Sequence, residues 1–546
     1  MRAQKRNAQF RPLIICGVAI SSFILMGLLL IPMLGLEVDE VMFAKALLVP
    51  RGGVAWFSFY HHYYPSMLMS YMGALKSWLY APLAILARPP VWPGIWAIRL
   101  PMLLLAAFTI GLTGRLLWMI AGERAAVCVI CLLSTDSSIL LTAAFDWGPV
   151  VLQNFLLVCV LLLLLAWRRF SREWLLFYAA IVLGLALWNK ALFLWNFSGM
   201  LVALSVVAFK PVMRLVSFKR AVLIIAGLAL GAYPLLRYNV KDRGPTLRRN
   251  ANLGTNEIGP KLRNMAATIN GQLAPVQLVD MRQKAPDTVA RPFAAESLWA
   301  AGVFAAIRTP YLLYVETAAI LLGLFAGTPG QRRWIGFFAL SFLIGWAESV
   351  ATVGAGSSVH HTALFLVEWY CALALSIAVL AAMGRLARVL AIVVTVLICL
   401  SGLASQNVIY ANMLSFDAQP QWSNADEPLL AWLTESGVKR AVLIDWGISD
   451  LVTTLSRNQI AVTDVSGALS DGNFDANLYR TCLAPACVVI GHSTDHTIFD
   501  HASKLFTNSL VKLQNSGNPV LSVEERTFAD THRVPIYRVL ELRTAS

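Results

Sequence analysis

The chain has 546 residues, of which 58% are hydrophobic and 14% are charged, and its mean hydropathy is +0.65. This composition excludes a soluble globular protein, because too little of the chain is polar enough to face water. The net charge of +14 would suit a nucleic-acid-binding protein, but the Lys and Arg residues cluster between apolar runs, as in cytoplasmic membrane loops. We therefore expect a polytopic α-helical membrane protein with no nucleic acid partner.

Eleven apolar runs are long enough to be transmembrane helices. A helix of about twenty apolar residues crosses roughly 30 Å of hydrocarbon with its backbone hydrogen bonds satisfied internally. The predicted spans lie near 13–34, 98–119, 124–143, 147–167, 174–189, 191–209, 221–238, 308–327, 334–352, 362–383 and 387–409.

The basic residues predict the orientation of these spans. Arg2, Lys5 and Arg6 place the N-terminus in the cytoplasm. Alternation then puts the other Lys and Arg clusters of the short loops inside and leaves only Lys190 in the short outer loops, where it reads as a lipid anchor. A further apolar run, 65–87, would reverse this pattern if it crossed the membrane, so we expect it to lie along the outer interface. Short cytoplasmic loops favour a bacterial inner membrane.

An odd number of spans also places the C-terminus outside. From about residue 413 the composition becomes mixed, and helical patterns (PLLAWLTESG, ISDLVTTLSRN) alternate with strand patterns (KRAVLIDW, QIAVTDV, ACVVIGH, VPIYRVLEL). This predicts a transmembrane domain, 1–412, with long outer loops at 35–97 and 239–300, followed by an extracytoplasmic α/β domain, 413–546.

The cysteines leave one pairing open. Six of the eight lie in or beside apolar runs, where Cys is usually a small buried hydrophobe. Cys482 and Cys487 lie in TCLAPACVVIG of the outer domain, where they either form a disulfide or remain thiols. A zinc pair is disfavoured, because no further ligand has suitable spacing.

Two carboxylates at the lip of the bilayer are the first functional candidates. The stretch GLEVDE sets Asp39 and Glu40 directly after the first span. A carboxylate at that depth is costly to desolvate, and its pKa rises unless cations or donors hold it. The two residues are either catalytic or simply solvated outer residues.

Cationic and polar residues gather at the same predicted face. The candidates for lipid-phosphate or sugar binding are Lys76 in YMGALKSW, Asp146 in AFDWGP, Arg237 at the end of the seventh span, His61 and His62 in HHYYP, and His360 and His361 before the tenth span. Each has a structural alternative. Asp146 suits a helix N-cap, Arg237 suits snorkelling to headgroups, and adjacent histidines suit a polar anchor. The basic residues of the loop 239–300 either contact anionic lipid or acceptor, or belong to a solvated loop.

A carboxylate with cations at a lipid interface suits transfer from a phosphate-linked lipid donor. The carboxylate accepts a proton from the acceptor, and Lys or Arg stabilises the departing phosphate. Neither role needs a nucleotide-binding loop, and GERAAV lacks the Walker pattern.

The stretches VDEVMFAKA, YMGALKSWLYAPL and AFDWGPVVLQ resemble the C-type glycosyltransferases. The similarity is greatest to the branch that contains the protein O-mannosyltransferases and the lipid A aminoarabinose transferases. It covers the first 240 residues best, the later spans by architecture, and the C-terminal domain weakly. The resemblance implies an inverting transfer with Asp39 as general base and Glu40 as the second member of the acidic pair.

The resemblance also assigns roles to two further residues. Lys76 matches a lysine that helps to hold the lipid phosphate in the aminoarabinose branch. That branch has a Lys-Pro-Pro element, whereas here Ser77 and Trp78 follow, which weakens any claim about aminoarabinose. Asp146 matches the acidic residue of the second outer loop, which shapes the site or holds a metal.

The expected function is transfer of a hexosyl or pentosyl group from a polyprenyl-phosphate sugar to an acceptor that is a protein, a lipid or a glycan. No cofactor is certain, and a divalent metal requires that Asp39, Glu40, Asp146 and the histidines come together. Two alternatives remain. A transporter or flippase of a lipid-linked substrate would favour charged residues at the bilayer midplane and an internal repeat. A non-catalytic scaffold would tolerate loss of the Asp39 charge.

Overall fold

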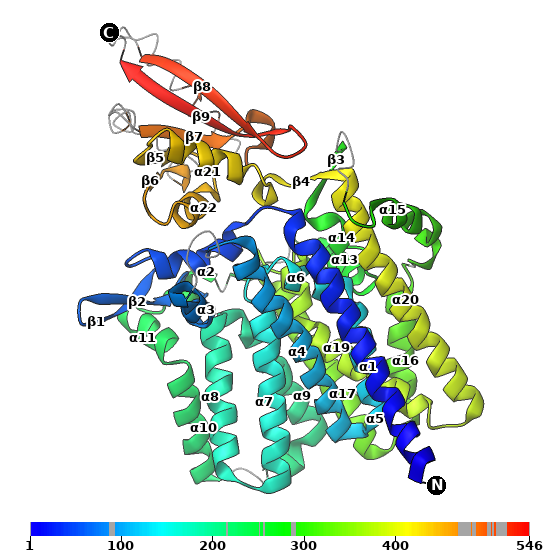
Figure 1. Cartoon of the computed structure of the whole chain (residues 1–546). Helices are drawn as coiled ribbons and strands as arrows, with labels where there is room; N and C mark the ends of the chain where they lie inside the picture. Colours follow the sequence, from blue (N-terminus) through cyan, green and yellow to red (C-terminus); the bar gives the residue numbers. More distant parts are fainter. Residues whose placement is uncertain are drawn as a thin grey trace.

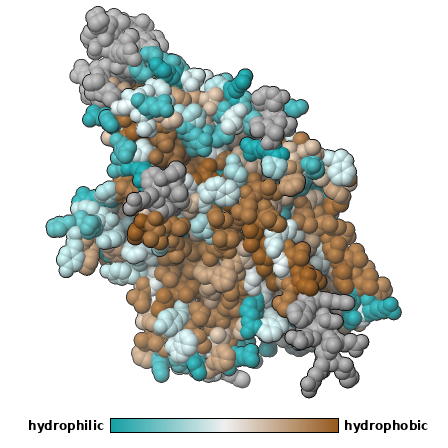
Figure 2. Space-filling model, in the orientation of Figure 1, coloured by the Kyte–Doolittle hydropathy of each residue, from teal (hydrophilic) through white to brown (hydrophobic). Residues whose placement is uncertain are grey.

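The computed structural model describes residues 2–86, 93–213, 217–250, 252–254, 257–284, 291–308, 310–467, 482, 487–498, 504, 507–508 and 521–544. A bundle of long helices forms the lower part of the molecule, and a small sheet lies above one end of it (Figure 1). Hydrophobic side chains form a broad band around the helices, with hydrophilic side chains at both ends of the band (Figure 2). The chain is an integral membrane protein, as its composition predicts.

Within the part of the chain that the structure describes, seven helical segments are long and apolar enough to cross a membrane. They are 12–33 within and after α1 (Arg2–Leu30), α4 (Ile95–Ala121), α7 (Val150–Phe170), 191–210 within α9 (Leu194–Met213) and the short helix before it, α17 (Pro329–Ala351), 359–380 covering α18 (Val359–Thr362) and α19 (Leu366–Leu380), and α20 (Arg385–Ser415). Shorter apolar helices, α8 (Glu173–Asn189) and α16 (Leu312–Ala326), coincide with two other predicted spans. The total of eleven spans stays a prediction.

Two predicted spans are broken rather than straight. The pair α5 (Glu123–Thr135) and α6 (Ser137–Ala144) bends by 60°, and the pair α10 (Phe218–Gly231) and α11 (Tyr233–Lys241) bends by 75°. The first break has a clear cause. Asp136 lies in an extended conformation and caps α6 by accepting a hydrogen bond from Ile139 N at 2.7 Å, so the chain starts a new helix there.

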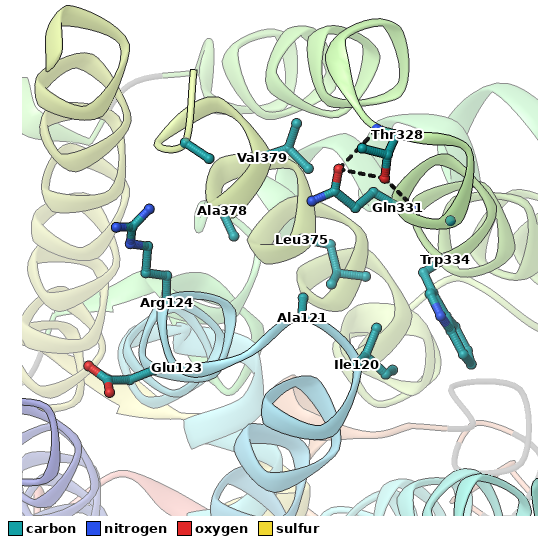
Figure 3. A pocket seen from close by; sticks show the side chains of 12 residues that line it. Ile120, Ala121, Glu123, Arg124, Thr328, Gln331, Trp334, Leu375, Ala378 and Val379 are labelled. Atoms are coloured by element: carbon teal, nitrogen blue, oxygen red, sulfur yellow. Dashed lines mark hydrogen bonds between the residues drawn. The ribbon is translucent and has the colours of Figure 1, made fainter. Parts of the chain in front are cut away.

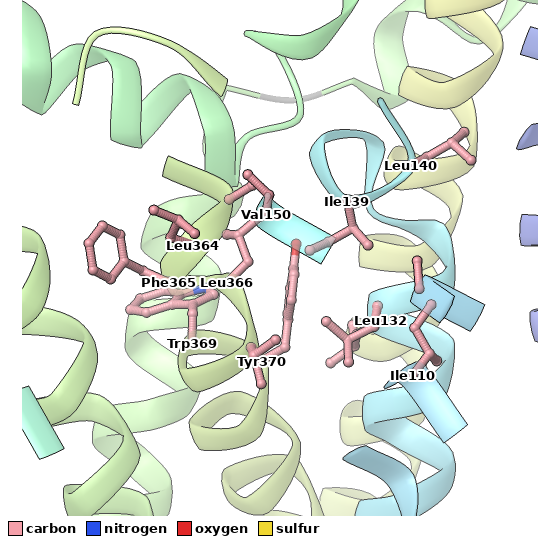
Figure 4. Close-up of a cluster of buried hydrophobic side chains, with 14 of the residues drawn as sticks. Ile110, Leu132, Ile139, Leu140, Val150, Leu364, Phe365, Leu366, Trp369 and Tyr370 are labelled. Atoms are coloured by element: carbon pink, nitrogen blue, oxygen red, sulfur yellow. The ribbon is translucent and has the colours of Figure 1, made fainter. Parts of the chain in front are cut away.

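Helix α19 lies at the centre of the bundle, since nearly all of its side chains are buried. Its side chains Trp369 and Tyr370 pack among aliphatic residues of neighbouring helices (Figure 4), which include Ile110 of α4 and Leu132 of α5. Lipid tails are as apolar as these side chains, so close packing rather than burial from water holds the helices together.

The two segments that the sequence predicts to be long outer loops contain helices and strands. The first contains α2 (Val38–Leu48), the hairpin β1 (Ala55–Phe59) and β2 (His62–Met67), and α3 (Leu75–Leu86). The second contains α12 (Pro245–Asn250), α13 (Ile258–Ile269), α14 (Ala274–Gln277), β3 (Val279–Lys284) and α15 (Ala294–Val303). With 12 residues, α3 is too short to span, in agreement with an interfacial position for that run.

One cation expected in the basic outer patch is instead buried. The Lys261 ammonium group of α13 donates to the carbonyl oxygens of Thr352, at 2.6 Å, and Val350, at 3.3 Å, and pairs with Glu257 at 3.1 Å. It therefore ties α13 to the end of α17 and is not free to contact lipid.

The residues after α20 form β4 (Phe416–Ala418), which pairs with β3, and then a five-stranded sheet with the order β6-β5-β7-β9-β8, here called the C-terminal sheet. Its elements are α21 (Asp426–Glu435), β5 (Arg440–Leu443), α22 (Ile448–Leu455), β6 (Ala461–Asp464), β7 (Cys487–His492), β8 (Leu521–Ala529) and β9 (Pro535–Thr544). Strands β6, β5 and β7 are parallel, and the β8–β9 hairpin adds antiparallel strands. Cys482 and Cys487 form a disulfide.

The C-terminal sheet packs on the bundle through α22 and α2. Lys45 of α2 forms an ion pair with Asp450 of α22, and the Thr454 hydroxyl donates to Val41 O at 3.4 Å. Leu451 and Met42 belong to one buried apolar cluster. The helix that carries Asp39 and Glu40 is thus enclosed between the bundle and the sheet.

Candidate active site

Helix α2 begins with a capping box that fixes both acidic residues of its first turn. Glu37 accepts a hydrogen bond from Asp39 N at 2.6 Å, and Glu40 accepts one from Glu37 N at 3.2 Å. The helix starts immediately after the first span, so the sequence places Asp39 and Glu40 on neighbouring faces of one turn.

Glu40 is held by Arg99 of α4. Both oxygens of the carboxylate accept from the guanidinium group, at 2.6 and 2.7 Å, and both side chains have no exposed surface. The guanidinium also donates to the carbonyl oxygens of Ile31, Leu34 and Gly35 at 2.5 to 2.9 Å. This bidentate pair therefore joins the end of the first span to α2 and α4.

Asp39 has a different environment. Its carboxylate is partly exposed and makes no hydrogen bond or ion pair with the residues that the structure describes. Burial raises the pKa of Asp39, while the charges of Lys190 and Lys76 oppose that rise. Of the acidic pair, Asp39 is the residue whose carboxylate is available to a substrate.

Lys76 of α3 and Asp146 form a buried ion pair beside this carboxylate. The Lys76 ammonium group lies 2.6 Å from Asp146 Oδ1, donates to Gly148 O at 3.1 Å, and sits 4.1 Å from the centre of the Phe43 ring. Tyr80 donates to the other Asp146 oxygen at 2.5 Å. Burial raises the pKa of Asp146 to about 7, although Lys76 and Tyr80 favour the ionised form.

The alternative reading of Asp146 as a helix N-cap is wrong. Its backbone has a φ of +46°, and the residue that precedes α7 is Pro149, with no side-chain cap. The conformation turns the Asp146 side chain back toward Lys76, so this loop serves the site rather than the helix start.

Lys190, which the sequence analysis interprets as a lipid anchor, belongs to this cluster. It lies between α8 and α9, is 2% exposed, and pairs with Met72 through an isolated β-bridge. A lipid anchor would reach the headgroups, whereas this ammonium group is buried and feels the charges of Asp39 and Lys76. Burial lowers the pKa of Lys190 to about 8, against the effect of Asp39. No hydrogen bond of its ammonium group to the described residues is found.

His360 also reaches this region. Its ring packs on Trp147, with centroids 4.7 Å apart, and on His361 at 4.1 Å, while Ser358 Oγ lies 2.8 Å from its Nδ1. A Cβ atom added to Gly148 would lie 4.0 Å from both the His360 ring and Lys190 Nζ. The loop that carries Asp146 therefore packs between these two side chains.

The remaining predicted residues lie on another surface. His61 and His62 are exposed at the turn of the β1–β2 hairpin, and Arg237 of α11 is exposed with its guanidinium 4.9 Å from the Phe57 ring. They share the hairpin and α11 rather than the buried cluster around Asp39. A role for them in substrate binding stays a prediction.

A metal held by Asp39, Glu40, Asp146 and histidines has no support from the geometry. Arg99 occupies Glu40 and Lys76 occupies Asp146. Among the described residues, the one group of three ligand side chains with metal-like spacing lies elsewhere, at Asp417, Asp530 and His532.

Gly73 of the YMGALKSW stretch makes the approach of α3 to Lys190 possible. Its N–H donates to Asn189 O at 3.2 Å, and an added Cβ would lie 2.0 Å from Trp188 O. We expect Gly73→Ala to lower stability by about 1–3 kcal/mol through overpacking, measured as thermal unfolding in detergent. Gly111→Ala is the control, since that site in α4 has open space around it. Equal melting of both variants would contradict the close contact.

A cavity of about 700 Å³ lies at the opposite end of the bundle from α2. Its lining comes from the α4–α5 junction, α17 and α19 and includes Glu123, Arg124 and Gln331 (Figure 3). Gln331 belongs to a capping box with Thr328 at the start of α17. The cavity is far from the acidic pair and contributes no side chain to the cluster around Asp39.

The bundle, the folded outer segments and the sheet above them are similar in fold to ArnT from Cupriavidus metallidurans, in agreement with the fold that the resemblance predicts. The structure bound to undecaprenyl phosphate has a TM-score of 0.57 and 11% identity, covering 96% of this chain and 97% of that one. The apo structure has a TM-score of 0.51 and 12% identity, with 98% of each chain covered. No protein-family model matches the sequence, and no curated protein matches it in sequence.

Proposed function

We propose that the protein transfers a sugar from a polyprenyl-phosphate-linked donor to an acceptor at the extracytoplasmic face of a bacterial inner membrane. The observation that carries this proposal is the carboxylate of Asp39, which has no partner among the described residues and lies beside the buried ammonium groups of Lys76 and Lys190. The bound undecaprenyl phosphate of the structurally similar ArnT supports a polyprenyl-phosphate donor.

The chemistry needs one base and one phosphate site. The acceptor hydroxyl or amine attacks the anomeric carbon, the bond from that carbon to the phosphate oxygen breaks, and the electron pair leaves with the polyprenyl phosphate. Asp39 takes the proton of the acceptor. Because the acceptor attacks from the face opposite the phosphate, the anomeric configuration is inverted. Lys190, whose ammonium group has no hydrogen bond in the described part of the chain, holds the departing phosphate.

Three other residues position these groups. The Arg99 pair keeps Glu40, and with it the first turn of α2, in place. Asp146 fixes Lys76, whose positive charge adds to that of Lys190. Glu40 is accordingly a positioning residue in this mechanism.

The direct test uses the purified protein in detergent with a panel of polyprenyl-phosphate hexoses and pentoses, with and without envelope extract as acceptor source. Release of free polyprenyl phosphate and of an inverted glycoside is the expected result. Consumption of none of the donors would overturn the proposal in favour of a transporter or a scaffold.

We expect the pH dependence of transfer to report the protonation state of Lys190. Asp39 must be ionised, so kcat/KM rises with pH through its raised pKa. Lys190 must be protonated, so kcat/KM falls as pH increases through about 8. We expect Lys190→Arg to move the falling limb to higher pH, because a guanidinium stays protonated, and to leave the rising limb nearly in place. An unchanged falling limb would show that another group titrates there, and Lys219→Arg, at an exposed position in the first turn of α10, is the matched control.

A further inference from the structure

Three potential metal ligands meet where the bundle joins the C-terminal sheet. Asp417 lies in β4, directly after the last long helix, and Asp530 and His532 lie in the turn between β8 and β9. In Figure 1 this hairpin extends from the sheet toward β4. One ligand atom from each residue lies within 4.8 Å of the other two.

The turn is preorganised for this arrangement. Asp530 Oδ1 accepts from the backbone N–H groups of His532 and Val534, both at 2.9 Å, which leaves Oδ2 turned toward the His532 ring at 3.8 Å. Asn424 holds the turn from the other side, through hydrogen bonds of 3.0 and 3.1 Å with Thr531. The positions of Asp530 and His532 relative to β4 therefore do not depend on a bound ion.

Asp417 supplies an observation independent of the cluster. Its side chain is 2% exposed, and its Oδ1 atom, which lies 3.1 Å from His532 Nδ1, makes no hydrogen bond of acceptable geometry with any residue that the structure describes. A buried carboxylate without donors is costly and is found in proteins when it is paired or coordinates a metal. The unsatisfied oxygen points into the cluster.

The neighbouring charges do not balance the cluster. Asp280, which faces Asp417 across the β3–β4 ladder, is already neutralised by two hydrogen bonds of 3.0 Å from Arg282. Burial lowers the pKa of His496, the nearby histidine, and so disfavours a positive charge on that ring. A protonated His532 would offset only one of the two carboxylates.

We propose that Asp417, Asp530 and His532 bind one divalent transition-metal ion, Zn²⁺ or an ion of similar chemistry, which fastens the C-terminal sheet to the outer segments of the bundle. Zn²⁺ accepts both imidazole nitrogen and carboxylate oxygen as ligands, whereas Ca²⁺ and Mg²⁺ take oxygen ligands. Ligand atoms at about 2.0–2.2 Å from the ion lie roughly 3.3 Å apart in tetrahedral geometry, a value between the 3.1 and 3.8 Å that separate His532 Nδ1 from the two carboxylate oxygens. Water completes the coordination. The site is separate from the proposed chemistry at Asp39.

The test uses the full-length protein in detergent, stripped with a chelator and dialysed against Zn²⁺. Bound metal is counted by mass spectrometry, and thermal unfolding is followed with and without the ion. His532→Cys keeps a zinc ligand but loses the imidazole, and His532→Lys keeps a positive charge but loses the ligand. We expect one bound Zn²⁺ in the wild type and in His532→Cys, and affinity at least tenfold lower in His532→Lys and Asp417→Asn. The Glu435→Gln variant, which changes an exposed carboxylate at the end of α21, should bind as the wild type does.

Two outcomes would overturn the proposal. One is equal Zn²⁺ uptake by the wild type and His532→Lys, since the cluster would then be only a His–carboxylate charge group. The other is the absence of both Zn²⁺ uptake and a visible Co²⁺ absorption band in the wild type, a result that does not depend on whether any variant folds.

Discussion

Asp39→Asn is expected to reduce transfer by about 10²- to 10⁴-fold, the usual contribution of a general base, with little change in the binding of the donor. The amide has nearly the same shape as the carboxylate and keeps the first turn of α2, because Asp39 contributes only its backbone N–H to the capping box. It cannot take a proton from the acceptor. The measurement is release of polyprenyl phosphate at saturating donor, together with donor affinity determined separately.

The matched control is Glu435→Gln, which removes one exposed carboxylate at the end of α21, away from the cluster. Turnover of Asp39→Asn equal to that of the control would remove Asp39 from the mechanism. A loss of donor binding equal to the loss of turnover would instead give Asp39 a role in recognition.

Arg99→Met is expected to have the largest effect on stability. Removal of one partner from a buried ion pair leaves an uncompensated charge and costs about 3–5 kcal/mol. Here the change also leaves the carbonyl oxygens of Ile31, Leu34 and Gly35 without their donor. Loss of folded protein on heating, followed by fluorescence and size-exclusion chromatography, measures the effect.

Arg115→Met on the same helix is the control, since that guanidinium is exposed and stacks on Trp118 at 4.1 Å. The double variant Arg99→Met, Glu40→Gln should be less destabilised than Arg99→Met alone, because the buried charge is then absent. Equal destabilisation of the single and double variants would show that Arg99 acts through the carbonyl oxygens rather than through Glu40.

Asp39 can be predicted from the sequence because a charged residue directly after an apolar run is easily recognised. The partners of Glu40 cannot be predicted in this way. Arg99 is 59 residues from Glu40 and lies inside a predicted span. A single basic residue there changes the mean hydropathy of the span very little. A charge within a span is itself a signal of function or pairing, and that signal would have found Arg99.

Lys190 and Asp146 show a second limit of the sequence. A lysine at the end of a span has the same local pattern whether it reaches lipid or is covered by another segment. It is covered here because the strand-like stretch around Met72 bridges to it. Likewise, Asp146 has a φ of +46° and contacts Lys76 and Tyr80, which are 70 and 66 residues away, so neither feature is visible in the local sequence.

The bend between α5 and α6 is likewise not evident from the local sequence pattern. Hydropathy averages over 124–143 predict one span, since a single Asp changes the mean little. The hydrogen bond from the Tyr370 hydroxyl to Asp136, at 2.8 Å, and the N-cap that Asp136 provides decide the local geometry. Composition thus predicts the location of a span better than its straightness.

The ion pair between Lys45 and Asp450 joins residues 405 positions apart in the chain. During biosynthesis, α2 emerges and reaches its side of the membrane long before α22 has been made. Contacts of such high sequence separation form late, so the helix that carries Asp39 remains uncovered by its apolar partner Leu451 until the last quarter of the chain has been synthesised and folded. A nascent or truncated chain would hold every residue of the candidate site and still lack the surface that covers α2.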